Sequence, residues 1–206
     1  AVRTLMPGGE LCIVIPDSIL ASKGMKPIRQ IITDNTQILG VVSLPQHTFT
    51  PCGVQTINSS ILFTKKFKKE YFDELEKSST PNDTEYLSKL KKKYGYDNYS
   101  VFMGVAREIG YEPNGKPTKN KKNDLDVILN DFRKAKEKGF FQGEDYRKIS
   151  DNSFVMKLSM TNDRLDSRYH WFMNILENKM YEKVPLGQYI TFSENKIDPR
   201  TRPEEV

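Results

Sequence analysis

The 206-residue sequence predicts an α/β fold, because three short apolar runs alternate with helical signals. The runs are 10–16 (ELCIVIP), 38–45 (ILGVVSLP) and 59–66 (SSILFTKK). Continuous apolar runs of this length are typical of strands that are covered on both faces. Strand, helix, strand is the pattern of a parallel sheet, whereas a third strand reached through a loop can run antiparallel to its neighbour.

Two helices are expected between the first two strands. Asp17 or Ser18 can cap a short helix over 18–22. Pro27 can begin a second helix over 27–35, because proline suits the first helical turn. Asp17 also ends a strand on the side where α/β sheets place their sites, but capping is the favoured role.

After the third strand, the composition indicates helices outside the sheet and one more strand. Residues 67–98 are rich in Lys, Glu, Tyr and Leu and read as a helix–loop–helix insertion. A strand is expected over 99–111, and an amphipathic helix over 120–138 with its cap near Asn123. Beyond Gly139 the pattern weakens until another helix at 168–180.

The charge favours a polyanionic partner. The net charge is +5 and the pI about 9.0, with 37% apolar and 29% charged residues. Lysines cluster at 65–69, 89–93 and 119–122. Phosphate binding requires such grouping, although solvated surface runs would look the same.

Disulfide, metal and membrane roles have little support. Cys12 and Cys52 are too few for a disulfide scaffold, and with only His47 and His170 no metal-ligand spacing occurs. No apolar run approaches the roughly 20 residues that cross a bilayer, and no signal peptide is visible. We therefore expect a cytoplasmic protein without a metal.

Three motifs resemble one enzyme family when they are taken in order. They are LMPGGELCIVIPDSILAS, ILGVVSLPQHTF and GVQTINSSILFTKK. Together they resemble the C-terminal half of the catalytic domain in N6-adenine DNA methyltransferases, above all type I modification subunits and fused type IIG enzymes. FMGVAREIGYEPNGK resembles the segment that follows, so the likeness covers about 1–135. It implies the C-terminal part of a Rossmann-like methyltransferase sheet with a helical insertion.

The tail carries a second likeness. NDRLDSRYHWF, VPLGQYITF and NKIDPRTRPEE resemble the junction between a methyltransferase and a target-recognition region like that of a type I specificity subunit. The expected division is 1–160 for the methyltransferase part, with its insertion at about 67–98, then 161–184 for a connecting helix and 185–206 for the start of a recognition region. A fused modification and specificity polypeptide is the favoured interpretation.

The long polar loop before 59–66 acquires a role from this resemblance. A hairpin needs far fewer residues, so the loop looks built to contact something. Methylation of adenine N6 requires the base to leave the duplex, and a flipped base needs an aromatic face. The resemblance places that aromatic residue at Phe49, with Thr48, Thr50, Gly53 and Val54 shaping the loop. Alternatively, Phe49 plugs the end of the core.

The family's catalytic and cofactor motifs do not occur in this sequence. No Asn-Pro-Pro or Asp-Pro-Pro tripeptide is present, and no glycine loop follows a strand. In an intact enzyme both motifs would lie upstream of Ala1, so we expect no catalytic residue here, no methylation by these residues alone and no affinity for S-adenosylmethionine. The intact enzyme would use that cofactor, double-stranded DNA and possibly specificity or restriction subunits, with direct methyl transfer to the adenine nitrogen.

Weaker candidates complete the set. Lys65, Lys66, Lys68 and Lys69 are candidate phosphate contacts. Asp124 and Asp126 suit a helix dipole better than a metal, and Trp171 with its aromatic neighbours suits core or interdomain packing. Two rival functions stay open: a non-catalytic module that binds DNA or a subunit, and methylation of RNA or protein on the same scaffold.

Overall fold

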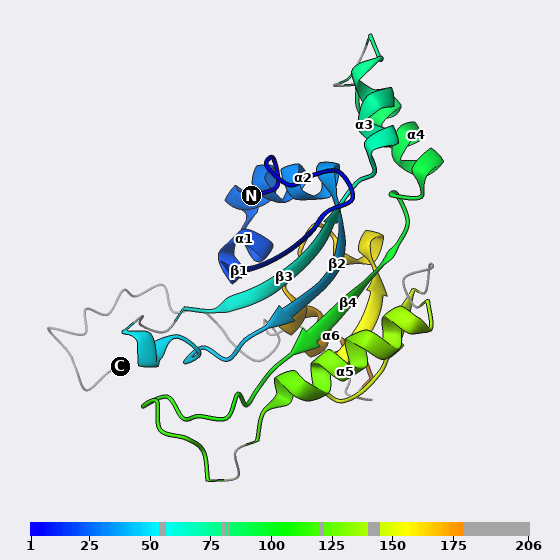
Figure 1. Ribbon diagram of the computed structural model, residues 1–206. Helices are drawn as coiled ribbons and strands as arrows, with labels where there is room; N and C mark the ends of the chain where they lie inside the picture. The colour runs from blue at the N-terminus through cyan, green and yellow to red at the C-terminus, as the bar shows by residue number, and fades with distance from the viewer. Residues whose placement is uncertain (54–56, 80, 82, 120–121, 140–144, 179–206) are drawn as a thin grey trace, which may run out of the picture. The chain divides into compact units, whose positions relative to one another are not determined.

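A computed structural model describes residues 1–53, 57–79, 81, 83–119, 122–139 and 145–178 (Figure 1). Residues Ala1–Met173 form one compact unit, and Asn174–Val206 form a second. The expected recognition region at 185–206 lies outside the described residues, so the division of the chain stays a prediction.

A six-stranded mixed sheet, in the order β1-β3-β2-β4-β6-β5, forms the centre of the first unit. This architecture confirms the predicted α/β class. The strands are β1 (Glu10–Pro16), β2 (Thr36–Ser43), β3 (Ser59–Lys66), β4 (Ser100–Val105), β5 (Tyr146–Lys148) and β6 (Ser153–Lys157).

Strand directions bring three carboxyl ends to one edge. β3 lies between β1 and β2 and runs antiparallel to both, as expected for a strand reached through a loop. β2 pairs in parallel with β4. Pro16 pairs with Ser59, and Ser43 with Ser60, so β1 and β2 end beside the start of β3. This edge is where open α/β sheets bind their ligands.

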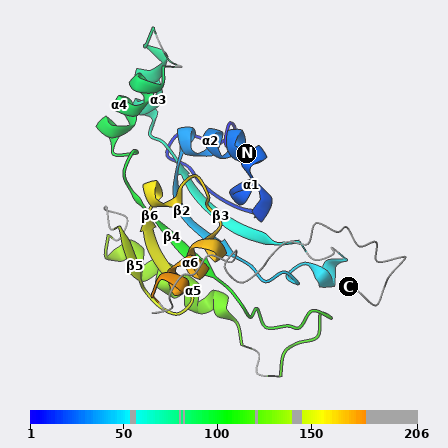
Figure 2. The ribbon, with the colours of Figure 1, turned by 180° about the vertical axis from the view of Figure 1, so that it is seen from behind.

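Helices cover both faces of the sheet. α1 (Asp17–Ala21), α2 (Lys26–Asn35) and the start of α6 (Ser167–Asn178) lie on one face, where Leu20, Ile32 and Leu165 share one core. α5 (Asp124–Glu137) covers the other face and buries Ile128. Figures 1 and 2 show α5 and α6 on opposite sides of β4.

The insertion forms a small aromatic core of its own. It contains α3 (Lys69–Glu76) and α4 (Thr84–Tyr94). Phe67, Tyr71 and Leu90 are buried there, and the Phe67 and Tyr96 rings stack with centroids 4.0 Å apart. The aromatic residues between β3 and β4 therefore fold the insertion outside the main sheet.

Several expectations about individual elements were wrong. β1 is not covered on both faces, because it is a terminal strand and Val14 is 47% exposed. Neither Asp17 nor Ser18 caps α1, since Pro16 is the N-cap and makes no side-chain hydrogen bond. The strand expected over 99–111 ends at Val105, and β5 and β6 lie where no strand was expected.

Candidate nucleic-acid interface

The candidate interface lies where β1, β2 and β4 end. The loop from Leu44 to Asn58 projects from this edge, next to the segment that leaves β4 (Figure 1). Its two stems meet at the sheet, where the Leu44 N–H donates to the Ser59 carbonyl over 2.9 Å. Residues 54–56 are outside the described part of the loop.

Phe49 lies at the start of a short 3-10 helix, Thr50–Cys52. Its side chain is half-buried, and its carbonyl accepts a hydrogen bond from the Cys52 N–H at 3.0 Å. Among the described residues, no aromatic ring stacks on Phe49. A partly exposed ring on a rigid turn can offer a face to a planar ligand, but it can equally close the end of a core.

Thr48 fixes the first half of the loop. Its backbone N–H and its hydroxyl both donate to the Pro45 carbonyl, over 3.0 and 2.6 Å. Its own carbonyl accepts a hydrogen bond from the Tyr111 hydroxyl. Thr48 therefore supports the turn before Phe49 and joins it to the segment after β4.

Thr50 and Gly53 shape the second half. The Gly53 N–H donates to the Thr50 carbonyl over 3.0 Å. Gly53 has φ +79°, a conformation that side chains disfavour. The Thr50 hydroxyl is buried and has no hydrogen-bond partner in the described part of the chain. Val54, the fourth expected support, lies outside the described residues.

The segment after β4 braces the loop from a second side. The His47 and Tyr111 rings meet edge to face, with centroids 6.2 Å apart. A side-chain carbon added at Gly115 would lie 3.3 Å from Pro51. These contacts were not foreseen in the sequence, because more than 60 residues separate the two segments.

Arg168, at the start of α6, holds both stems of the loop. One guanidinium nitrogen donates to the Leu44 carbonyl over 2.5 Å, and the other donates to Asn58 Oδ1 over 3.1 Å. The planar fork of arginine suits such a double contact. Arg168 was not predicted from the sequence, because the segment around it resembled only a junction between two regions.

A buried chain of polar groups lies beneath this contact. Ser60 Oγ donates to Asp17 Oδ1 over 2.6 Å and lies 3.2 Å from Ser43 Oγ. Ser167 Oγ lies 2.8 Å from Ser43 Oγ and donates to the Gly104 carbonyl over 2.6 Å. Asp17, the first residue of α1, does not cap this helix but anchors a network that links α1 to β3, β2, β4 and α6.

Burial has the largest effect on the pKa of Asp17. Loss of solvent raises the pKa of its carboxyl above the ordinary value, and the Ser60 hydrogen bond and the charge of Arg168 act in the opposite direction. The carboxyl faces an open groove of about 800 Å³ that is also lined by Asn58, Arg164 and Phe172. We call it the α1–α6 groove. It begins at Ile57 and Asn58, where the loop from Leu44 to Asn58 (the Phe49 loop) ends.

The candidate phosphate-binding lysines lie at the opposite end of β3. The strand runs from Ser59 to Lys66, so about 23 Å separates its ends at about 3.3 Å per residue. Lys65 pairs with Glu10 at 3.4 Å, and Lys66 donates to the Val2 carbonyl over 3.1 Å. Lys68 and Lys69 lead into α3. Phosphate contact by these lysines stays a prediction. Because of their distance from Phe49, any phosphates that they contact would not be those beside Phe49.

Asp124 has a structural role. Its carboxylate accepts hydrogen bonds from the backbone N–H groups of Arg107 and Glu108, over 2.9 and 3.0 Å. Burial alone would raise the pKa of this carboxyl, but these two bonds lower it below the ordinary value. Asp124 and Asp126 both lie in the first turn of α5, as the dipole argument expected.

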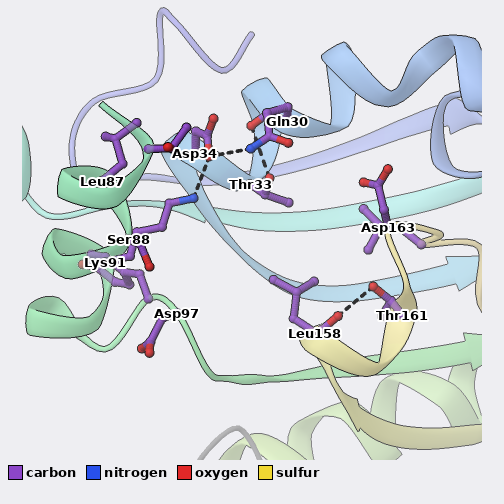
Figure 3. Close-up of a pocket in the computed structure, with 13 residues that line it drawn as sticks. Gln30, Thr33, Asp34, Leu87, Ser88, Lys91, Asp97, Leu158, Thr161 and Asp163 are labelled. Atoms are coloured by element: carbon purple, nitrogen blue, oxygen red, sulfur yellow. Dashed lines mark hydrogen bonds and ion pairs between the residues drawn. The ribbon is translucent and has the colours of Figure 1, made fainter. Parts of the chain in front are cut away.

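A second pocket lies between α2, α4 and the turn before α6 (Figure 3). Lys91 crosses it and pairs with Asp34 at 2.6 Å. Asp97 and Asp163 also line it, but no group of three or more metal-ligand side chains occurs among the described residues. No helix in the described part of the chain is long and apolar enough to span a membrane.

The turn at Gly8 and Gly9 does not fit the glycine loop that binds S-adenosylmethionine. The glycine pair precedes β1 instead of following a strand, and the Gly8 N–H is directed at the Lys66 and Phe67 carbonyls. The Gly9 N–H donates to Met6. These donors are engaged, so they cannot form an anion-binding turn.

Comparison with known families identifies the chain. A family model described as N-6 DNA methylase matches residues 1–167. The chain belongs to this family. The match confirms the resemblance found in the sequence motifs, and it extends through β6 to the first residue of α6.

Individual proteins are similar to this N-6 DNA methylase chain over a short segment or at low sequence identity. "Defense against restriction protein B" of Escherichia phage P1 is 33% identical over 61 residues, which are 30% of this chain and 3% of that protein. The modification subunit of a putative type I restriction enzyme from Vibrio vulnificus shows 17% identity and a TM-score of 0.42, over 76% of this chain and 25% of its own.

Two further solved structures have slightly higher scores. The type I restriction enzyme EcoKI M protein shows 14% identity and a TM-score of 0.48, with 85% of this chain and 40% of that chain covered. A chain of a type I R-M system complex shows 13% identity and the same TM-score of 0.48, with coverages of 84% and 33%. The N-6 DNA methylase chain thus spans less than half of each solved chain.

Proposed function

We propose that this chain is part of a sequence-specific DNA adenine-N6 methyltransferase of a restriction-modification system, in which it supplies the surface that holds the target base. The supporting observation is the position of Phe49. A half-buried aromatic ring lies on a turn that Thr48 and Tyr111 brace, in a loop whose stems Arg168 holds, at the carboxyl edge of the sheet.

The chemistry requires the target adenine to leave the duplex, because its amino group is otherwise engaged in pairing. The Phe49 face would stack on the extruded base and offset part of the unstacking cost, by roughly 1 to 3 kcal/mol. S-adenosylmethionine supplies the methyl group in such enzymes, and its transfer to the amino nitrogen needs no protein nucleophile. This chain contributes no cofactor site in the proposal.

The proposal also covers the setting of the enzyme. Double-stranded DNA is the substrate, and specificity or restriction subunits are the expected protein partners. Residues 1–160 would be methyltransferase, 161–184 a connection and 185–206 the start of a recognition region. A DNA substrate implies a cytoplasmic location.

The decisive experiment compares Phe49→Ala with Phe49→Trp in the full-length polypeptide that carries this chain. Fluorescence of 2-aminopurine at the target position reports extrusion, and adenine methylation reports turnover. We expect Phe49→Ala to reduce both by about tenfold, and Phe49→Trp to retain most of both, because either ring can stack.

Val127→Ala is the matched control, since Val127 is 50% exposed on α5 and lies outside the site. Equal loss of activity in the control, or normal extrusion in Phe49→Ala, would return Phe49 to a purely structural role.

The absence of an Asn-Pro-Pro tripeptide from this sequence favours a second candidate, a non-catalytic module that binds DNA or a subunit. Methyl transfer separates the two functions. If the full-length polypeptide labels no adenine with unmethylated DNA and cofactor present, the binding module is the better description. If RNA or protein is labelled in place of DNA, methylation of RNA or protein on the same scaffold is the better description.

A further inference from the structure

We infer that the α1–α6 groove binds an unpaired nucleotide of the DNA beside the target adenine. This inference rests on the proposed function and names a second contact for the same substrate. The groove is bounded by α1, by the end of the Phe49 loop and by α6. It holds about 800 Å³ of open space, which is within the range of sites for molecules of nucleotide size.

A stacked pair forms one wall of the groove. The Arg164 guanidinium carbon lies 3.9 Å from the centre of the Tyr169 ring. Asp166 holds the guanidinium from the side, with Arg164 Nε donating to Asp166 Oδ1 over 2.6 Å. The Arg164 side chain is still 42% exposed. Proteins that bind unpaired nucleotides stack bases on such arginine planes and aromatic rings.

Phe172 adds an exposed aromatic side chain to this wall. It lies three residues after Tyr169, so both side chains project from the same side of α6. Phe172 is 53% exposed, and Ile57 across the groove is 49% exposed. Two large apolar side chains at this exposure leave room for a flat apolar ligand between the helix and the loop.

Hydrogen-bonding groups also line the groove. The Asp17 carboxyl can accept from an exocyclic amino group, and the Asn58 amide can donate or accept. Two arginines and two aspartates line the groove, so their formal charges cancel. This balance suits the edge of a base better than a run of phosphates, which would need an excess of positive charge.

Position links the groove to the target base. Ile57 and Asn58 end the loop that carries Phe49, and the Asn58 carbonyl accepts a hydrogen bond from the Asp17 N–H over 2.9 Å. A strand opened at the target adenine would therefore meet the groove with a neighbouring nucleotide. Packing of another protein in the groove is the competing use, and binding of an oligonucleotide separates the two.

Trp171 provides the readout, because it is the only tryptophan in the chain and it lines the groove. We would titrate the 206-residue chain with an eight-nucleotide single-stranded DNA of mixed sequence, and with the same backbone carrying abasic sites. We expect the complete oligonucleotide to quench Trp171 and to bind about tenfold more tightly than the abasic one. Equal affinity for both, or no binding, would overturn the inference.

Phe172→Leu tests the groove directly, because it removes the ring and keeps an apolar side chain. We expect it to weaken binding of the complete oligonucleotide by about tenfold while leaving the abasic one unchanged. Val127→Ala, on the other face of the sheet, should change neither affinity. Unchanged affinity in Phe172→Leu would refute the nucleotide site and leave protein packing as the use of the groove.

The outcome separates this inference from the proposed function. Normal affinity in Phe172→Leu together with impaired base extrusion in Phe49→Ala refutes the groove and keeps the function. Impaired affinity in Phe172→Leu with normal extrusion in Phe49→Ala keeps the nucleotide site and removes the proposed role of the loop.

Discussion

At the scale of single residues, the Asp124 carboxylate stabilises the point where the chain leaves β4. Strand β4 ends at Val105, and the next backbone N–H groups would lack partners if nothing replaced the sheet. Asp124 accepts from two of them, at Arg107 and Glu108. The apolar pattern of 99–111 predicts a longer strand. The pattern cannot show that Asp124 replaces the strand partner after Val105.

Asp124→Asn should lower the free energy of unfolding by about 1 to 2 kcal/mol at pH 7, because two hydrogen bonds lose a charged acceptor. Asp126→Asn, an exposed neighbour in the same turn, should change it little. Urea denaturation measures both. A loss in the control as large as that in Asp124→Asn would show that helix charge alone is responsible.

The effect of Asp124 should also depend on pH. The pKa of the folded carboxyl lies below its ordinary value of 3.8. The stabilisation is therefore present above about pH 4 and is lost as the pH falls through the folded pKa. The difference between the wild type and Asp124→Asn should shrink in urea denaturation below that pH. A difference that grows on acidification would contradict this assignment.

Arg168→Met should loosen the Phe49 loop without unfolding the sheet. The substitution keeps a long side chain but removes both hydrogen bonds to the stems at Leu44 and Asn58. Amide hydrogen exchange in 44–53 should quicken by about tenfold, which corresponds to about 1.4 kcal/mol of local stability. Arg133→Met, on the exposed side of α5, is the control. Unchanged exchange in the loop would mean that other contacts suffice.

At the scale of elements, close packing sets the distance between α5 and the sheet. A side-chain carbon added at Gly104 would lie 2.9 Å from Ile128 Cγ2 and 3.2 Å from Val42 Cγ2. Both neighbours are buried, so neither can move away freely. Glycine is required here because of the approach of the helix, not because of its backbone freedom.

Gly104→Ala should destabilise the protein by about 1 to 3 kcal/mol, as expected for an overpacked core. Gly24→Ala is the matched control, because nothing lies within 4 Å of the added carbon. Thermal unfolding should show a lower midpoint for the first variant alone. Equal midpoints for the two variants would mean that α5 shifts at no cost.

Leu90→Ala should unfold the insertion locally. Leu90 is 3% exposed in the aromatic core of α3 and α4, where large-to-small changes cost about 2 to 5 kcal/mol. Hydrogen exchange should lose protection in α3 and α4, while β4 stays protected. Lys89→Ala, at a neighbouring exposed position, should leave both unchanged. Loss of protection in β4 would show that the insertion is part of the main core.

The elements that the sequence predicts are those with long or repeated signals. The runs at 10–16 and 59–66 form strands over these residues, and the run at 38–45 lies in β2 as far as Ser43. Asn123 caps α5 by accepting from the Leu125 N–H at 3.1 Å. β5 has only three residues, which is too short to show the alternation of apolar and polar side chains that indicates a strand. The exposure of β1 was unpredictable, because apolar content does not reveal which neighbours cover a strand.

At the scale of the whole molecule, the candidate interface combines residues that are distant in the sequence. Ser43 and Ser167 are 124 positions apart, yet their hydroxyl groups lie 2.8 Å from each other. The motif resemblance could assign an expected role to Phe49, because Phe49 belongs to one continuous segment. It could not predict Arg168 or the polar network, because such contacts depend on how β2, β3 and α6 pack together.

The last prediction concerns the cofactor. Calorimetric titration of the 206-residue chain with S-adenosylmethionine should show no specific heat of binding. The reason is geometric, since α1 follows β1 directly at Asp17 and the donors of Gly8 and Gly9 are already engaged. A sheet edge without a glycine turn offers no anion-binding nest for the cofactor carboxylate. Binding of the oligonucleotide by the same sample would show that it is folded, so saturable cofactor binding would mean that the chain holds a site of another kind.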